Sequence, residues 1–125
     1  MSKIVHTDSA PAAIGPYSQA VISGSLVFTS GQIAINPKSG EVEATDIVGQ
    51  TEQVMQNLCE VLRAAGSSPS GVIKTTCFLA DMADFAAFNA VYAKYFTENP
   101  ARSCVAVKTL PKNALVEVEV IAAIQ

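Results

Sequence analysis

Arg102 and Glu117 are the two residues of this 125-residue chain whose types and positions best suit chemistry on a small organic acid. Arg102 follows Pro100-Ala101 at the start of an apolar segment, and its planar guanidinium could bind a carboxylate through two parallel hydrogen bonds. Glu117 lies in the last apolar segment, where partial burial would raise its pKa toward a value useful for orienting or deprotonating water. Structural alternatives stay open, because Arg102 could form an ion pair with Glu117 or Glu119 or a salt bridge at an interface, and Glu117 could pair with Lys108. Glu119 lies one pleat further along the same strand face, so spacing alone does not choose between the two carboxylates.

Five further positions could contribute to a binding site. Ser30 and Gly31 follow an apolar segment, and the backbone N–H of Gly31 could approach an anion, although a turn or bulge would explain the glycine equally well. Tyr17 could offer its ring to a cleft or belong to the core. Asn89 could donate to a ligand or cap a loop. Cys104 has no histidine beside it to lower its pKa, so its thiol is expected to pack while its backbone carbonyl remains an acceptor.

The residue inventory excludes several common mechanisms. The chain has one histidine, His6, so Ser-His-Asp and Cys-His catalysis and histidine-rich metal sites are not expected. Its three cysteines, Cys59, Cys77 and Cys104, form no Cys-x-x-Cys motif, which argues against a zinc site and a disulfide framework. No cofactor motif is present. The predicted chemistry therefore depends on carboxylates, arginine, backbone groups and water.

Charge and hydropathy narrow the class of protein further. The net charge is −3 and no two of the eight basic residues are adjacent, so no nucleic-acid partner is expected. No apolar run is long enough to span a membrane, and the segment that starts with Met1-Ser2-Lys3 lacks the apolar region of a secretory signal. We therefore expect a cytoplasmic protein with no membrane partner.

The elements that must position these residues follow from hydrophobic periodicity and turn signals. Apolar residues recur with the helical period from Ile47 to Ala65, with Thr45 or Asp46 as the expected N-cap and Gly66 just after the C-terminus. Asp84 is the expected N-cap of a second helix. One face of this helix carries a stripe of aromatic residues, expected to be core: Phe85, Phe88, Tyr92, Tyr95 and Phe96. Five strands are predicted, at Ser18–Ile22, Leu26–Ser30, Val72–Leu79, Ser103–Val107 and Leu115–Ile124.

This order, β-β-α-β-α-β-β, predicts a single α+β domain over residues 1–125, with a mixed sheet and both helices on one face. In the last strand, alternate residues from Val116 to Ile124 should pack under the helices. The other face, from Leu115 to Ala123, is half apolar and carries Glu117 and Glu119. We expect further copies of the chain to cover that face.

Four ordered motifs resemble the Rid (reactive intermediate deaminase) family, and most closely its RidA branch of enamine and imine deaminases. The resemblance covers nearly the whole chain. The matching segments are Ala10-Pro11 with residues 13–20, residues 28–33, Phe88-Asn89 with Tyr92, and Pro100 to Ser103 with Val105, Leu110-Pro111 and Val116-Glu117. The one departure noted at the signature end is Val118, where isoleucine or methionine is usual.

The resemblance implies a chorismate-mutase-like fold, a homotrimer, active sites in the clefts between subunits, and a last strand that brings Glu117 beside Gly31. The implied activity is hydrolysis of 2-iminopropanoate and 2-iminobutanoate, which pyridoxal-phosphate-dependent dehydratases release, to 2-keto acids and ammonia without a cofactor or metal. Carried over by position, Arg102 would bind the substrate carboxylate and Glu117 would position water. The Cys104 carbonyl and the Ser30-Gly31 backbone would hold the imine end.

Tyr17 and Asn89 would shape the same pocket. An alternative within the same fold is a non-enzymatic trimer that binds small carboxylates, acts as a chaperone or inhibits translation. Arg102 discriminates between the two, because branches without this arginine are not expected to deaminate. The acidic pI of about 5.0 argues against direct RNA cleavage.

Overall fold

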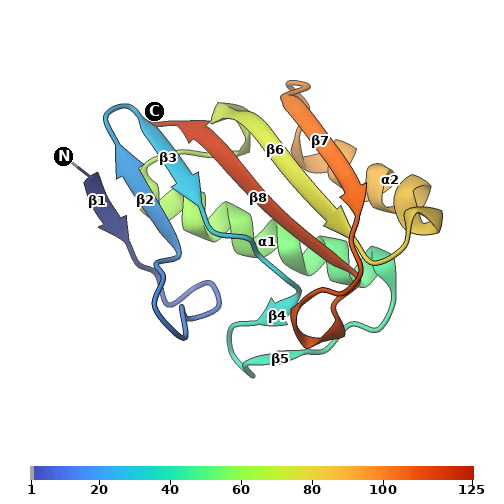
Figure 1. The fold of residues 1–125 in the computed structure, drawn as a ribbon. Coiled ribbons are helices and arrows are strands. Elements are labelled where there is room, and N and C mark those ends of the chain that lie inside the picture. The colour runs from blue at the N-terminus through green and yellow to red at the C-terminus, as the bar shows by residue number, and fades with distance from the viewer. Residues whose placement is uncertain (1) are drawn as a thin grey trace.

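The computed structural model describes residues 2–125 and has two main helices behind one six-stranded sheet (Figure 1). The helices are α1 (Ile47–Ala65) and α2 (Phe85–Tyr95), and the strands are β1 (Ser2–Val5), β2 (Ala20–Ser23), β3 (Leu26–Thr29), β4 (Ile35–Asn36), β5 (Glu41–Val42), β6 (Val72–Leu79), β7 (Ala101–Ala106) and β8 (Val116–Ala123). Three short 3-10 turns occupy Pro69–Gly71, Met82–Asp84 and Pro111–Asn113. No helix within residues 2–125 combines the length and the apolar character needed to cross a bilayer.

The strand order in the sheet is β1-β2-β3-β8-β6-β7, in which β6 and β7 run parallel and all other neighbours run antiparallel. Both helices lie on one face of this sheet, and the opposite face is uncovered (Figure 1). The predicted α+β mixed sheet with two helices on one face is confirmed. The last strand in the sequence lies in the middle of the sheet, between β3 and β6, so it connects the two halves of the fold.

Helix α1 forms where its sequence signals predicted it. Asp46 is the N-cap, and its Oδ1 accepts a hydrogen bond of 3.0 Å from the Gly49 amide. Gly66 ends the helix in the left-handed region at φ 85°, and its amide and that of Ser67 bond back to Arg63 and Leu62. Substituting Gly66 would force a side chain into a conformation that costs about 1–2 kcal/mol.

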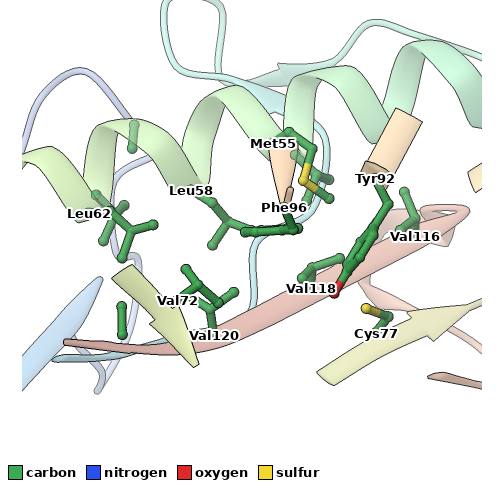
Figure 2. Packing of buried hydrophobic residues seen from close by; sticks show 14 of the residues in the cluster. Met55, Leu58, Leu62, Val72, Cys77, Tyr92, Phe96, Val116, Val118 and Val120 are labelled. Atoms are coloured by element: carbon green, nitrogen blue, oxygen red, sulfur yellow. The ribbon is translucent and has the colours of Figure 1, made fainter. Parts of the chain in front are cut away.

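The core lies between the sheet and the two helices (Figure 2). Val116, Val118 and Val120 of β8 are buried beneath α1, which contributes Met55, Leu58 and Leu62. Tyr92 and Phe96 close the core from α2. Burial of each such side chain contributes about 1.5–3 kcal/mol, which is why the alternation in β8 specifies its inward face.

Helix α2 begins directly after Asp84, as predicted, but the expected side-chain cap is missing. Asp84 is not a side-chain cap, because the chain makes a 3-10 turn first and Asp84 already has helical backbone angles. Asp81 caps that turn instead, accepting a hydrogen bond of 2.8 Å from the Ala83 amide. The aromatic stripe is core as predicted at Phe88, Tyr92 and Phe96, which are buried, whereas Phe85 and Tyr95 are only partly buried.

The structure adds three short strands to the five that were predicted. β1 pairs with β2 at the sheet edge, and only Val5 of its four residues is buried. β4 and β5 form a two-residue ladder joined by the turn at 37–40. These elements bury too little apolar surface to produce a recognisable alternation.

Candidate active site

Glu117 is placed by the central strand β8 and lies directly against Gly31. An isolated bridge joins Gln32 to Val118, with N–H···O bonds of 2.9 Å and 3.1 Å in the two directions. This bridge holds the segment after β3 so close that a Cβ at Gly31 would lie 2.6 Å from Oε2 of Glu117. A side chain at position 31 would therefore displace the Glu117 carboxylate, and the predicted proximity of Gly31 to Glu117 is confirmed.

The Glu117 carboxylate is half-buried, and it forms no ion pair within residues 2–125. None of the ion pairs among residues 2–125 includes Glu117, so the predicted alternative of a pair with Lys108 does not form within the chain. Partial burial raises the pKa of Glu117 above the ordinary 4.5, and the charge of Glu119 on the same strand face raises it further. Such a carboxylate is a stronger proton acceptor than an exposed one.

A groove of about 580 Å³ surrounds Glu117 and Gly31. Its other walls are the N-terminal loop, including Tyr17, the segment around Ile33, and the turn at Pro111-Lys112. The Tyr17 ring is 54% exposed and faces this groove rather than the core. The Ser30 hydroxyl instead donates to the Ser18 carbonyl at 2.6 Å and braces the start of the loop.

Two buried amide side chains hold the walls of this groove in place. Gln19 accepts from the Thr7 amide at 2.7 Å and donates to the Pro11 carbonyl at 2.8 Å, which ties down the N-terminal loop. Asn57 of α1 donates to the carbonyls of Ile33 and Ile35 at 3.2 Å and 2.9 Å. The groove is thus built on hydrogen bonds to irregular backbone that would otherwise be left unpaired.

The turn on the far side of the groove contains backbone strain. Lys112 and Asn113 both have left-handed backbone angles, at φ 56° and 53°. Asparagine tolerates this region, whereas a lysine in it costs about 1–2 kcal/mol. The strain lies at the rim of the groove that contains Glu117, where such outliers are often found in functional sites.

Arg102 is the second residue of β7, the edge strand, and is held by three side chains of α2. Its Nη1 donates to Oδ1 of Asn89 at 2.6 Å, and its Cζ lies 4.8 Å from the Tyr92 ring centroid and 5.3 Å from that of Phe85. Arg102 and Asn89 line a second hollow of about 550 Å³ near Pro100. The guanidinium is exposed, and no ion pair within residues 2–125 includes it.

Arg102 and Glu117 lie on opposite faces of the sheet of one chain. Arg102 is the register partner of Thr75, which is buried under α2, and paired residues of parallel strands share a face. Glu117 alternates with the buried Val116 and Val118, so it projects from the uncovered face. The alternative of an ion pair between Arg102 and Glu117 or Glu119 within one chain is therefore excluded.

Cys104 packs against the core beside its register partner Cys77. Burial raises the pKa of both thiols, that of Cys77 to about 12, so both remain protonated near neutral pH. The Val107 amide donates to the Leu79 carbonyl on β6. Because amide directions alternate along a strand, the backbone groups of Arg102 and Cys104 point to the free edge, where the Cys104 carbonyl can accept a hydrogen bond.

The uncovered face of the sheet carries apolar side chains beside the two carboxylates. Ile4, Val21, Phe28 and Ile121 form a row of cross-strand partners, and Phe28 is 41% exposed. Phe78 and Val105 continue the apolar surface beside Glu117. The uncovered face thus presents apolar side chains to its surroundings next to Glu117.

The prediction missed the support that α2 provides for Arg102. Phe85 and Tyr92 were expected only in the core, whereas both also contact the guanidinium. Their spacing with Asn89, at i, i+4 and i+7, places a polar residue in an aromatic row and was the available signal. Within residues 2–125, no three histidine, cysteine, aspartate or glutamate side chains gather closely enough to hold a metal ion.

Known proteins closely resemble the whole chain. A RutC family protein of Pasteurella multocida is 52% identical over 127 residues, covering 98% of both chains. The 2-iminobutanoate/2-iminopropanoate deaminase of Escherichia coli is 49% identical over 126 residues, again covering 98% of both. The crystal structure of E. coli TdcF with bound serine has a TM-score of 0.92 at 46% identity, covering 97% of this chain and 98% of that one. Residues 7–124 match the family described as Endoribonuclease L-PSP, so the chain belongs to that family, and the predicted relationship to its RidA branch is confirmed.

Proposed function

We propose that neighbouring copies of this chain form active sites that hydrolyse short 2-imino acids, such as 2-iminopropanoate and 2-iminobutanoate, to 2-keto acids and ammonia. The observation that carries the proposal is the Arg102 guanidinium, which is exposed, held by Asn89 and two rings, and free of any carboxylate within residues 2–125. A guanidinium held in this way suits the carboxylate of a 2-imino acid. The deaminase relative at 49% identity supports the same substrate class.

The site needs two copies because one chain keeps its two charged groups apart. The hollow at Arg102 supplies a cation and an amide, and the groove at Glu117 supplies a carboxylate and close backbone. The apolar uncovered face, with Phe28 and Val105 exposed, supports packing of copies against one another. In the proposed homotrimer, Arg102 of one copy faces the Glu117 groove of the next.

The reaction is an addition of water followed by loss of ammonia. Arg102 binds the substrate carboxylate, which fixes the electrophilic imine carbon in the groove. Glu117 orients a water molecule and accepts one of its protons as the carbon–oxygen bond forms, and the raised pKa of Glu117 favours this role. Protonated Glu117 then returns its proton to the nitrogen of the tetrahedral adduct, the carbon–nitrogen bond breaks to release ammonia, and the hydroxyl gives up its proton to solvent as the carbon–oxygen double bond forms. Holding the two reactants together supplies much of the acceleration, and the step needs no electron transfer.

The remaining predicted residues would position the substrate. The Cys104 carbonyl and the Gly31 backbone would hold the imine nitrogen, and Ser30 would act through the loop that it braces. Tyr17 would line the pocket on the side of the Glu117 groove, and Asn89 would line it on the side of the Arg102 hollow. The proposed substrates are products of pyridoxal-phosphate-dependent dehydratases acting on serine or threonine, so the proposed setting is the cytoplasm.

The direct test generates the imine in place with a threonine dehydratase and follows release of 2-keto acid and ammonia. The wild-type chain should accelerate both. Arg102→Ala should abolish the acceleration, whereas Arg63→Ala should not, because Arg63 is 78% exposed and paired with Glu60. Activity that persists in Arg102→Ala would remove the proposed role.

A mixing experiment tests whether the site is shared between copies. Arg102→Ala and Glu117→Gln subunits, each inactive alone, are unfolded together and refolded as a mixture. Random assembly into a ring should restore about a quarter of the wild-type activity, because one interface in four then combines an intact arginine with an intact glutamate. A mixture that stays inactive while forming mixed assemblies would place the whole site within one chain.

The alternative is a protein that binds small carboxylates without converting them. The relative TdcF, whose structure contains bound serine, supports this alternative. The same assay separates the two. A pure binder would show affinity for 2-keto acids that depends on Arg102, with no turnover and no dependence on Glu117.

A further inference from the structure

We propose that Tyr92 is a positioning residue for Arg102. Its ring packs against one face of the guanidinium and fixes the guanidinium plane, so that the free N–H groups face the ligand. The inference rests on the proposed function, in which Arg102 binds the substrate carboxylate. Tyr92 itself would touch no reacting atom. Its role would be to determine where the guanidinium lies before the acid arrives.

Arg102 would otherwise be a mobile side chain. It is exposed and lies at the beginning of an edge strand. A long, unrestrained side chain must lose rotamer freedom when it binds, which weakens affinity. In this chain one guanidinium nitrogen already bonds Asn89, and the Tyr92 ring centroid lies 4.8 Å from Cζ, within the range of a cation–π contact.

Three residues of α2 form this support as one row on the helix. Phe85, Asn89 and Tyr92 are spaced at i, i+4 and i+7, so they lie along a single face of α2. That face packs toward β7, where Arg102 shares the helix-covered side of the sheet with Thr75. The two rings supply apolar and cation–π contacts, and the amide of Asn89 supplies a directed hydrogen bond.

Tyr92 differs from Phe85 because both ends of its side chain are anchored. Its hydroxyl and that of Thr75 form a buried hydrogen bond of 2.8 Å, and Thr75 is the register partner of Arg102 on the neighbouring strand. Figure 2 shows the Tyr92 ring reaching from α2 to the sheet, with its oxygen at the sheet end. Ring contacts with Phe88 at 5.6 Å and Phe96 at 4.8 Å hold its sides, and only 8% of Tyr92 is exposed.

The held guanidinium keeps enough donors for a ligand. Arginine has five N–H donors in a planar fork, and within residues 2–125 the one hydrogen bond from the guanidinium goes to Asn89. Two parallel N–H groups therefore remain for a carboxylate. The anchored ring fixes the plane of that fork, which a lysine or an unsupported arginine would not provide.

Arginine NMR tests this directly, because the chain contains only two arginines, Arg63 and Arg102. With ¹⁵N-arginine label, the Nε–Hε signal of Arg102 should show an aromatic ring-current shift and slow, restricted motion. Arg63, at 78% exposure, is the mobile reference in the same spectrum. Tyr92→Leu should bring the Arg102 signal to the mobility of Arg63, and Tyr92→Phe should restore most of the restriction.

Leu62→Ala is the matched control, because Leu62 is a fully buried core residue of α1 that lines neither the hollow at Arg102 nor the groove at Glu117. It should lower the melting temperature comparably while leaving the Arg102 signal restricted. If Tyr92→Leu does not fold, Phe85→Leu serves as a second variant, because Phe85 is less buried. It should remove part of the restriction on the motion of the Arg102 side chain. Arg102 as mobile as Arg63 in the wild type, or unchanged in the Tyr92 and Phe85 variants, would overturn the inference.

Ligand affinity gives the functional reading. Tyr92→Leu should weaken binding of 2-oxobutanoate, measured by calorimetry, about tenfold, with a matching rise in KM and a smaller change in kcat. In an Arg102→Ala background the same substitution should have no further effect. Equal losses of affinity from Leu62→Ala and Tyr92→Leu would contradict the inference. If the wild-type protein turns over the imine but its Arg102 side chain is mobile, the proposed function stands and this inference fails. If the Arg102 side chain is restricted but the protein shows no turnover, only the proposed function fails.

Discussion

Replacing Gly31 with alanine should separate activity from stability. The added methyl would lie 2.6 Å from Oε2, 2.8 Å from Cδ and 3.0 Å from Cγ of Glu117. Non-bonded heavy atoms normally stay roughly 3.5 Å apart, so the carboxylate must move by roughly 0.5–1 Å. The backbone itself can accept alanine, because Gly31 is not among the residues with positive φ.

The expected effect on catalysis is large and the expected effect on folding is small. A misplacement of about 1 Å in a reacting group can reduce the rate about 100-fold, so kcat/KM in the dehydratase-coupled assay should fall by about that factor. The clash involves the end of a flexible, half-buried side chain, so the free energy of unfolding should fall by only about 1 kcal/mol. Urea denaturation measures the second quantity.

Gly24→Ala is the matched control for this prediction. Gly24 has a positive φ of 61°, and no atom lies within 4 Å of the position that an added methyl would take. The cost there is backbone strain of about 1 kcal/mol, without contact with the groove, so activity should be unchanged. Near-normal kcat/KM in a folded Gly31→Ala protein, or equal activity losses in the two variants, would refute the assignment of Glu117. Combining Gly31→Ala with Glu117→Asp, which shortens the acid, should give a loss smaller than the sum of the two.

Three further predictions concern carboxylate titration and the groove wall. Glu119→Gln removes a negative charge that raises the pKa of Glu117, so the acidic limb of the kcat/KM profile should move to lower pH. Because the folded state raises the pKa of Glu117, its ionisation destabilises the fold as pH rises above 4.5, so Glu117→Gln should melt higher than wild type at pH 7 and lose that advantage in acid. Asn57→Ala leaves the carbonyls of Ile33 and Ile35 without their donor and should lower the free energy of unfolding by about 2–4 kcal/mol in urea titration.

Long elements with clear end signals were predictable to the residue. The helix at Ile47–Ala65 and the strand at Val72–Leu79 have the predicted bounds, because periodicity over several turns or pleats agrees with capping residues. β1 was missed because three of its four side chains are exposed, so hydrogen bonding rather than burial defines it. The Asp84 side chain makes no capping hydrogen bond, because Asp81 caps a 3-10 turn just before the helix. Local composition does not decide which of the two aspartates acts as the cap.

In the candidate site too, features set by local sequence patterns were predictable, and features set by contacts between distant segments were not. Alternation in the last strand predicted that Glu117 faces away from the helices, and the structure confirms it. The face of Arg102 depends on the register of β7 against β6, which no pattern within either segment specifies. The contacts of Arg102 with the α2 rings were not predicted from the sequence, because an aromatic residue that packs in the core can also contact a charged group with its ring.

The placement of Arg102 and Glu117 on opposite sides of one sheet has a use in engineering. Each face can be inactivated without touching the other, so copies joined in tandem by linkers could carry any chosen combination of intact and disabled halves. With sites shared between copies as proposed, such a concatemer would have a countable number of working sites, from none to one per interface. Its turnover, measured against that number, would report whether the sites act independently of one another.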